Sequence, residues 1–331
     1  MNVVSVAVIG AGLAGLACAR RLAEAGVHAR VFEAQRAPGG RLATRRFATA
    51  SFDHGAQFLT AVDDGFVRVL EAAEAAGAAG RWQPRWPDRE RPGDLWVGVP
   101  AMNSLPRFLA QDLDVEYGAR IVRIEHGRRG WALLDDRGLA HTDFTAVALA
   151  LPAPAAAALA GPRTAAAARA KAVPMAPCWA VLVAFDAALP GVPDAGSVGD
   201  GILAWYARNG SKPGREARDA FVLHAAAGWS RAALDQPAHT VQGALLDSFS
   251  EHVGQALPRT MVADAHRWRY ARVEAPLGED CLYDPQSGIG FCGDWCLDAR
   301  AEAAWISGRA LGAALATARE ITASGKIRGS R

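Results

Sequence analysis

The hydrophobic pattern at the start of the chain predicts a strand, a glycine-rich turn, a helix and a second strand. Residues 3–9 are a short β-branched run typical of a buried strand. Residues 16–25 have apolar positions at helical spacing and end at Gly26, a residue that favours the end of a helix. Residues 27–33 form a second apolar run. This order of elements is typical of the opening of a doubly wound parallel sheet.

The pattern beyond residue 60 predicts further helices and strands. Helical spacing is found at residues 66–76, 104–111, 240–256 and 301–319. Short apolar or alternating runs predict strands at residues 115–125, 131–135, 139–143, 146–151, 179–185, 202–207, 220–224 and 282–292. Residues 82–100, which are rich in Pro, Trp and Arg, are expected to be irregular, and residues 322–331 are expected to form a frayed end.

Composition and charge limit the class of protein and its partners. The 331 residues are 51% hydrophobic and 21% charged, which is typical of a globular chain long enough for two domains. A formal net charge of +2 gives no overall attraction to nucleic acid or to an anionic membrane, so neither is expected as a partner. The cysteines are scattered without a CxxC pair, and His54 and His141 are expected to be turn or surface residues. We therefore expect no metal site and a reducing, cytoplasmic location.

The turn between the first strand and the first helix contains the motif Gly10-x-Gly12-x-x-Gly15. The first glycine allows a tight turn, the second lets a ligand approach the backbone, and the third lets the helix pack on the strand. The helix N-terminus attracts the anionic pyrophosphate. Glu33 ends the second strand, where a carboxylate binds a ribose diol and disfavours a 2′-phosphate. These residues predict a dinucleotide-binding site.

A second glycine motif distinguishes a flavin from a nicotinamide as the resident cofactor. Residues 33–41 end in Gly39-Gly40-Arg41, and they resemble the Glu-x(n)-Gly-Gly-Arg signature of the flavin amine oxidase superfamily. A flexible Gly-Gly pair lets the chain pass under a bound dinucleotide, and Arg41 can pair with its phosphates. The resemblance implies FAD as the cofactor.

Two further segments are similar to motifs of the same superfamily. Residues 53–60 resemble the segment that runs along the isoalloxazine ring, which implies that Ala56, Gln57 and Phe58 border the ring. Val122 matches the position whose backbone holds the adenine.

The final flavin motif of the superfamily resembles residues 290–308. This resemblance implies that Asp294 binds the ribityl chain. It also implies that a helix starting near Ala303 and Ala304 directs its N-terminal dipole at the flavin. No cysteine stands where covalent members of the superfamily attach the flavin, so we expect non-covalent FAD.

The elements and motifs together predict an α/β protein with two domains. A Rossmann-type FAD-binding domain is expected from residues 1–60, 105–165 and 276–331. An inserted α+β substrate domain with a mixed sheet is expected from residues 61–104 and 166–275.

Within the superfamily the chain resembles the renalase family, on residues 54–60, 96–104 and 174–180 and on the pair Asn209 and His224. The resemblance implies oxidation of isomeric dihydro forms of NAD(P) to NAD(P)+ by hydride transfer to flavin N5, with O2 reduced to hydrogen peroxide. A dihydronicotinamide dinucleotide and O2 are then the expected partners.

The position of the lysines favours this reaction over amine oxidation. Amine oxidases of the superfamily place a lysine near flavin N5, and the matching position here falls near Ala180, with Lys171 and Lys212 outside it. A dihydropyridine needs no general base, because loss of hydride produces an aromatic ring. Holding the ring carbon about 3–3.5 Å from N5 therefore supplies most of the catalysis.

Five residues are candidates for the substrate pocket. Trp205 and Tyr206 can stack on a nicotinamide ring, with Trp268 as a third aromatic wall, while Asn209 and His224 can bind the carboxamide. Alternative functions are an amine oxidase or desaturase acting on another small molecule, and a non-catalytic flavin-bound scaffold. The sequence gives no oligomeric state.

Overall fold

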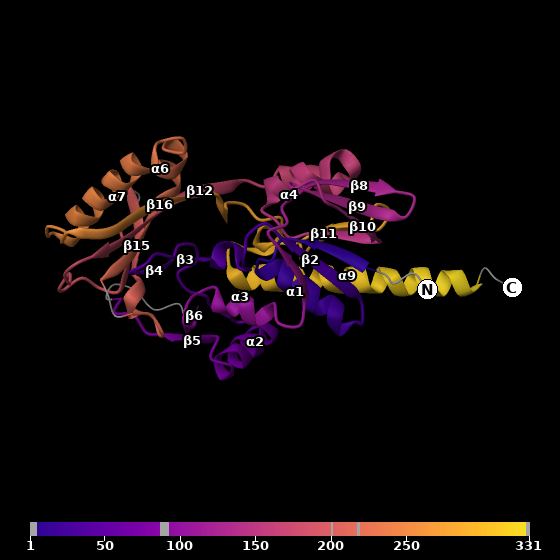
Figure 1. Ribbon diagram of the computed structural model, residues 1–331, viewed down its shortest axis with the longest axis horizontal. Coiled ribbons are helices and arrows are strands. Elements are labelled where there is room, and N and C mark those ends of the chain that lie inside the picture. The colour runs from indigo at the N-terminus through magenta and orange to yellow at the C-terminus, as the bar shows by residue number, and fades with distance from the viewer. Residues whose placement is uncertain (1–4, 87–92, 200, 217–218, 329–331) are drawn as a thin grey trace. The chain divides into compact units, whose positions relative to one another are not determined.

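The chain divides into two compact units. The computed structural model describes residues 5–86, 93–199, 201–216 and 219–328, with side chains up to residue 318 (Figure 1). The first unit contains Met1–Gly40, Pro106–Pro174 and Val273–Arg331, and the second contains Arg41–Leu105 and Met175–Arg272.

A six-stranded sheet forms the centre of the first unit. In spatial order its strands are β17 (Leu282–Asp284), β18 (Ile289–Phe291), β11 (Ala146–Leu149), β1 (Ser5–Ile9), β2 (His28–Glu33) and β7 (Asp114–Tyr117). All neighbours pair in parallel except β17 and β18, which are antiparallel. The chain order reverses at β1, as in doubly wound sheets, so the predicted Rossmann-type fold is confirmed.

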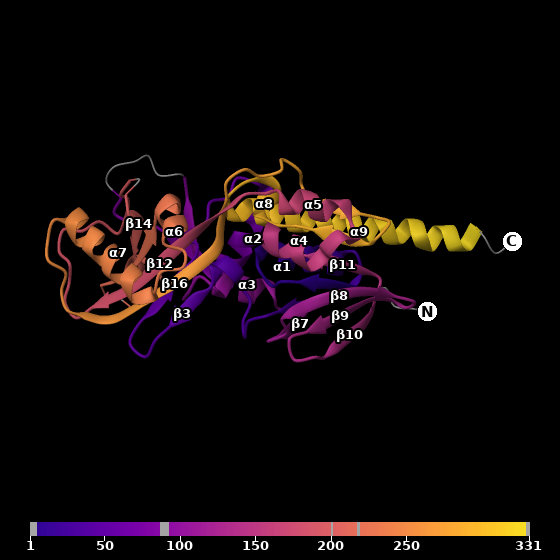
Figure 2. The same ribbon diagram turned by 90° about the horizontal axis from the view of Figure 1, so that it is seen from above.

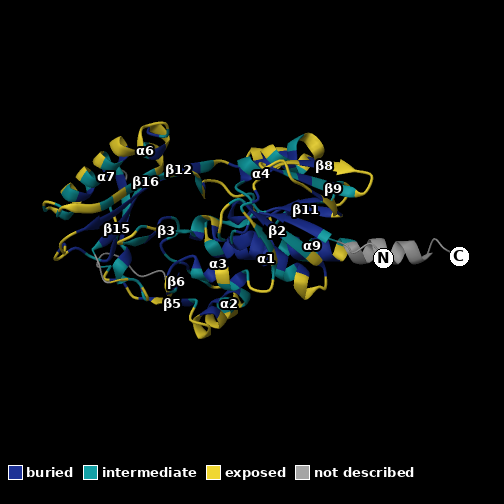
Figure 3. Cartoon of the chain, in the orientation of Figure 1, coloured by how far each residue is buried: buried dark blue, intermediate teal, exposed yellow. Residues whose placement is uncertain are grey.

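Helix α1 (Leu13–Glu24) lies alongside helix α9 (Ala301–Arg328) in this unit (Figure 2). A Cβ at Gly308 would lie 2.1 Å from a backbone oxygen of α1, and one at Gly312 would lie 2.8 Å from another. The two helices therefore pack closer than any larger residue would allow. Helix α1 is buried along most of its length (Figure 3).

The other elements of the first unit are short. They are α4 (Ala153–Ala160), α5 (Ala165–Lys171), α8 (Asp294–Leu297) and the antiparallel strands β8 (Ile121–Gly127), β9 (Gly130–Asp135) and β10 (Ala140–Phe144). Helix α3 (Ser104–Leu109) crosses the boundary between the units in sequence.

A five-stranded sheet forms the centre of the second unit. In spatial order its strands are β13 (Ala195–Ser197), β14 (Leu203–Arg208), β15 (Ala220–Ala225), β12 (Met175–Phe185) and β16 (Thr260–Val273). The unit also contains β3 (Thr44–Arg46), β4 (Ser51–Asp53), β5 (Ala79–Trp82), β6 (Leu95–Gly98), α2 (Asp64–Ala75), α6 (Ala227–Ala232) and α7 (Ala238–Val253).

The two faces of this sheet have different partners. Alternate residues of β12 and β15, together with Leu203 and Tyr206 of β14, pack with Val241, Leu245 and Phe249 of α7 in the larger core cluster. A second core cluster lies on the other face of the sheet, where Phe52 of β4 packs against Leu182 and other apolar residues of β12 and β15. Because successive residues of a strand point to opposite faces, the α7 face is filled and the other face carries the functional side chains described below.

Three predictions need correction. Residues 82–100 are not irregular throughout, because β5 and β6 pair in antiparallel register, while residues 87–92 lie outside the described part. The expected frayed end is helical to Arg328, since no proline interrupts α9. Residues 41–60 were assigned to the first domain but lie in the second unit, because β4 packs on its sheet.

Candidate functional site

The glycine loop of the first unit joins β1 to α1. Gly10 has φ 105°, and a Cβ there would lie 2.6 Å from the carbonyl oxygen of Ala150. A Cβ at Gly15 would lie 1.9 Å from the carbonyl oxygen of Gly10. At Gly12, the N-cap of α1, a Cβ would meet no atom within 4 Å. Gly10 and Gly15 are therefore required by the protein itself, whereas Gly12 keeps open the space in front of a helix N-terminus, where an anion binds.

Glu33 lies at this loop. Its side chain is 8% exposed, Oε2 accepts a hydrogen bond from the Ala11 N–H at 2.8 Å, and Oε1 accepts one from the Gln35 N–H at 2.8 Å. The Gly-Gly segment also passes here, because the Gly39 N–H donates to the Ala11 carbonyl at 3.0 Å. A Cβ at Gly40 would lie 3.4 Å from the Cα of Gly12. The structure thus brings the predicted pyrophosphate and ribose residues together.

The remaining cofactor residues of the first unit occupy three other places. Val122 is 51% exposed and lies at a bulge of β8, where the pairing with β9 shifts register. Asp294 begins α8 and is 5% exposed, while Ala303 and Ala304 are buried in the first turn of α9. An open helix N-terminus, a buried acidic residue and an exposed bulge fit a dinucleotide, and the individual contacts with FAD remain predictions.

Arg41 belongs to the second unit. Its Nη1 donates to the carbonyl of Ala271 at 3.0 Å, and its own carbonyl accepts a hydrogen bond from the Ala56 N–H at 2.9 Å. A Cβ at Gly55 would lie 2.1 Å from the same carbonyl oxygen. Residues 41 and 55–56 are therefore in close backbone contact. The pairing of Arg41 with phosphates remains a prediction.

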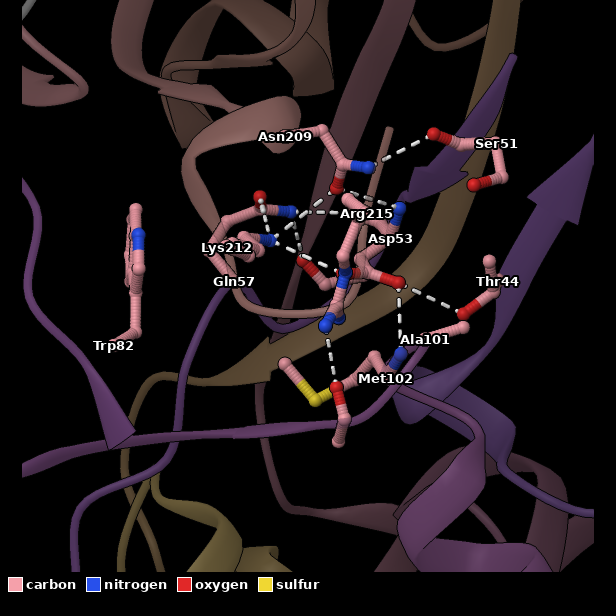
Figure 4. Close-up of polar contacts among 12 residues, drawn as sticks. Thr44, Ser51, Asp53, Gln57, Trp82, Ala101, Met102, Asn209, Lys212 and Arg215 are labelled. Atoms are coloured by element: carbon pink, nitrogen blue, oxygen red, sulfur yellow. Dashed lines mark hydrogen bonds and ion pairs between the residues drawn. The ribbon is translucent and has the colours of Figure 1, made fainter. Parts of the chain in front are cut away.

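A buried ionic cluster lies at the end of β4 (Figure 4). Asp53 Oδ2 accepts hydrogen bonds from Arg215 Nη2 at 2.6 Å and from Lys212 Nζ at 3.3 Å. Its Oδ1 accepts from the Met102 N–H at 2.9 Å and from Thr44 Oγ1 at 2.8 Å. Asp53, Lys212 and Arg215 each expose 2% or less of the side chain. Two cations and one carboxylate are thus held inside the protein.

The pKa values of this cluster follow from burial and from the excess of two cations over one carboxylate. Burial would raise the pKa of Asp53, but Lys212, Arg215 and the Met102 amide outweigh it and hold the pKa at about 2. Burial lowers the pKa of Lys212 to about 8, against the attraction of Asp53. The Lys212 ammonium therefore stays charged at neutral pH, and the Asp53 carboxylate favours this charge.

Two residues that were predicted to bind ligands are part of this cluster. Gln57 accepts a hydrogen bond from Lys212 Nζ at 3.0 Å and donates to the backbone oxygens of Asp53 and Gly55 at 2.5 and 3.0 Å. Asn209 donates to the Ser51 carbonyl at 2.8 Å, and its Oδ1 accepts from the Asp53 N–H at 3.3 Å. Asn209 is 2% exposed and its amide is already bonded. This placement argues against a substrate-binding role for Asn209.

An aromatic wall lies next to the cluster in the same unit. Phe58, Trp82, Trp86 and Trp205 form it, with ring centroids between 4.8 and 6.3 Å apart in the contacting pairs. Lys212 Nζ lies 5.5 Å from the centroid of the Trp82 ring. The predicted residues Phe58 and Trp205 are thus brought together, with Trp82 and Trp86 added to them. Such a wall suits a flat ring as its ligand.

Trp205 and Tyr206 face opposite sides of the sheet. Tyr206 is 2% exposed and packs against Phe221 and Phe249 under α7, so it is a core residue and not a pocket residue. Leu203 belongs to the same core cluster, although residues two apart in a regular strand share a face. The pairing of β14 with β15 shifts register between Leu203 and Trp205. This bulge turns Trp205 away from the core and onto the opposite face.

Three further rings contact one another in the second unit: His54, which follows β4, and His266 and Trp268 of β16. His54 stacks on Trp268 at 5.1 Å and contacts His266 at 4.7 Å, and Trp268 Nε1 donates to the His54 carbonyl at 2.8 Å. His54 is 7% exposed, so its prediction as a turn or surface residue was wrong. His224 also hydrogen-bonds to the His54 backbone. Burial lowers the pKa of His224 to about 4, so this imidazole is neutral at pH 7.

Ala180, where the lysine of amine oxidases was sought, lies directly opposite His224 in the β12–β15 register and is fully buried.

Sequence reasoning missed Asp53, Lys212 and Arg215 as a group. The scarcity of lysine was the available signal, because Lys212 is one of three lysines in the chain and lies completely buried.

His141 was also predicted to be a turn or surface residue, but it is 7% exposed. Its ring nitrogens lie 3.6 Å from Glu116 and 3.5 Å from Asp135. The three side chains are close enough together to bind one metal ion. Arg137 already pairs with both carboxylates.

Across the described residues, no helix is long and apolar enough to cross a membrane.

Comparison with known proteins identifies the family. The profile of the flavin containing amine oxidoreductases matches residues 62–314, and that of the NAD(P)-binding Rossmann-like domain matches residues 8–73. The first match covers more than half of the chain, so the protein belongs to the flavin containing amine oxidoreductase family. It is accordingly an FAD-dependent oxidoreductase.

Solved structures show the same fold. A protein assigned as a protoporphyrinogen oxidase from Exiguobacterium sp. 255-15 is similar with a TM-score of 0.76 and 13% identity, over 96% of this chain and 99% of that one. Cyclohexylamine oxidase from Brevibacterium oxydans IH-35A gives a TM-score of 0.73 and 14% identity, over 96% and 99%. Putrescine oxidase bound to putrescine gives 0.70 and 14%, over 96% and 99%.

Proposed function

We propose that this protein is a renalase-like oxidase that converts isomeric dihydronicotinamide dinucleotides to NAD(P)+. When bound, FAD supplies an acceptor for a hydride and transfers the two electrons to O2. The substrate ring loses a hydride and becomes a pyridinium. One O2 takes up that hydrogen, two electrons and one solvent proton, and leaves as hydrogen peroxide.

The observation that carries this proposal is the charge beside the aromatic wall. Lys212 lies over Trp82, and with Arg215 it outnumbers the single carboxylate of Asp53. A protonated amine brought to this wall meets cations and a carboxylate that is already paired, and a buried unpaired charge is costly. A dihydronicotinamide ring is uncharged, flat and able to stack on Trp205.

The protein's own residues have binding and positioning roles in this reaction. In the first unit, the loop at Gly12 and the Glu33 carboxylate would hold the dinucleotide portion of FAD. In the second unit, Phe58 and Trp205 would orient the substrate ring. Orientation is the main requirement, because loss of hydride from a dihydropyridine needs no base.

An amine oxidase is the second candidate, and one observation favours it. Lys212 is buried and donates a hydrogen bond to Gln57. Gln57 belongs to the segment 53–60, which resembles the flavin-lining motif. A lysine near the flavin is a property of amine oxidases, although Ala180 replaces it at the expected position.

Anaerobic mixing of the FAD-loaded protein with each class of reductant distinguishes the candidates. We expect isomeric dihydro-NAD(P) to bleach the flavin absorbance fast, and dopamine-like amines and polyamines to leave it unchanged. NADH itself should react about 100-fold more slowly, because its hydride lies on a displaced ring carbon. The proposal is wrong if a primary amine bleaches the flavin within seconds while the isomeric dinucleotides leave it oxidised.

A further inference from the structure

Among the described residues, the buried polar atoms without a hydrogen-bond partner include two on the face of the second unit's sheet that lies opposite α7. They are Nε1 of Trp205 and Nε2 of His224. The two residues are directly opposite each other in the β14–β15 register, so their side chains share one face of the sheet. Buried polar groups are nearly always satisfied, and the exceptions mark places where a ligand or water binds.

The two atoms have opposite hydrogen-bonding character. The indole Nε1 of Trp205 is a donor only. His224 is neutral at pH 7, because burial lowers its pKa to about 4. Its ring hydrogen-bonds to the His54 backbone, and the unpartnered atom is Nε2, so we assign the proton to Nδ1. Nε2 then presents a lone pair and can only accept.

Both side chains are fixed in orientation. The bulge between Leu203 and Trp205 turns the indole onto this face, and Trp86 packs edge-on against it at 4.8 Å. His224 is held by the His54 carbonyl, which also accepts from Trp268 Nε1 at 2.8 Å. A carbonyl oxygen has two lone pairs and can accept both donors. The donor and the acceptor are therefore preorganised.

We propose that Trp205 and His224 together recognise a planar primary carboxamide. Its oxygen accepts the Trp205 Nε1–H, and its NH2 donates to His224 Nε2. This inference rests on the proposed function and names how the substrate ring is held. A ketone has no donor for His224, and a carboxylate places a second oxygen against its lone pair. The pair therefore selects nicotinamide over ring analogues of the same shape.

Binding of oxidised dinucleotides to the FAD-loaded protein tests the pair without turnover. The dissociation constants of NAD+, its 3-acetylpyridine analogue and its nicotinic acid analogue are measured from the flavin absorbance change. We expect the acetyl analogue to bind about tenfold more weakly than NAD+, because it leaves Nε2 buried and unpaired. The carboxylate analogue should bind more weakly still.

Two substitutions separate the contributions. His224→Phe should abolish the difference between NAD+ and the acetyl analogue, whereas Trp205→Phe should weaken both by a similar factor, about 5- to 10-fold, and keep their ratio. Tyr206→Phe is the matched control, because Tyr206 points into the core on the opposite face. It should leave all three constants unchanged.

Equal binding of all three dinucleotides to the unsubstituted protein would overturn the inference, and this measurement does not depend on any variant folding. Persistence of the NAD+ preference in His224→Phe would overturn it as well. If the isomeric dihydro-NAD(P) forms bleach the flavin but the analogues are not distinguished, the pair is wrong and the proposed function stands. If neither bleaching nor NAD+ binding occurs, both are wrong.

Discussion

Replacing Asp53 with asparagine should destabilise the protein strongly at neutral pH. The change keeps the size of the side chain but leaves Lys212 and Arg215 buried without a counter-charge. Removal of one partner from a buried ion pair costs about 3–5 kcal/mol. The pKa of Asp53 gives a second measure of how much its charge stabilises the protein. A fall from 3.8 to about 2 corresponds to about 2 kcal/mol of folding free energy above pH 4. We expect a loss of about 3–5 kcal/mol at pH 7.

The pH dependence follows from the direction of each pKa change. Asp53 has a lowered pKa, so its contribution is present above its ordinary pKa of 3.8 and is lost as the pH falls toward 2. Lys212 has a pKa of about 8 instead of 10.5, so the unfolded chain binds more protons between these values and stability rises with pH in that window. In Asp53→Asn the pKa of Lys212 falls further, and the rise should begin below pH 8.

Equilibrium urea unfolding followed by tryptophan fluorescence at pH 7 and pH 9 measures both effects. Asp94→Asn is the control, because Asp94 pairs with Arg81 at the surface with 75% of its side chain exposed. It should change the unfolding free energy by less than about 0.5 kcal/mol. If Asp53→Asn unfolds within about 1 kcal/mol of the unsubstituted protein at pH 7, the ionic cluster does not have the energetic role that its burial indicates.

Three further predictions concern the cofactor. Gly12→Ala should leave the urea midpoint unchanged but lower FAD occupancy, because a Cβ at Gly12 meets no protein atom within 4 Å. Gly15→Ala should lower the melting temperature of the FAD-free protein, because its Cβ would lie 1.9 Å from a carbonyl oxygen. Equal stability losses in both variants would contradict this assignment. Glu33→Ala should weaken FAD retention about 10- to 100-fold through lost charge-assisted hydrogen bonds, measured as flavin released on dilution, with full occupancy as the opposing result. Acid precipitation should release intact FAD into the supernatant, and yellow colour in the pellet would show a covalent link.

The parts of the fold that sequence predicts are those encoded by neighbouring residues. The glycine turn, Glu33 and the parallel strands follow from spacing within the first 33 residues, and the structure places them at one loop. Strand β16 was not predicted, because charged residues interrupt its 14 residues and leave no continuous apolar run. Strand β6 was missed because Pro and Arg residues surround it.

The candidate site was only partly predictable, because its contacts are long-range. Asp53 and Lys212 are 159 positions apart, and no local pattern pairs them. Trp205 and Tyr206 look equivalent in sequence, and only the β-bulge decides which one lies on the face opposite α7. Asn209 was assigned to the substrate because its amide can bind a carboxamide, but its partners in the structure, Ser51 and Asp53, lie 158 and 156 positions away in sequence.

The packing of α9 on α1 has a consequence for synthesis. Glu24 on α1 pairs with Arg309 on α9, 285 residues later, and Gly308 lies against the backbone of α1. Helix α1 of the first unit therefore lacks its partner helix until the ribosome has made α9. The second unit is complete once Arg272 has emerged. Domains fold as units during translation, so the sheet of the second unit should reach its native form first, and FAD should be loaded only after α9 has emerged.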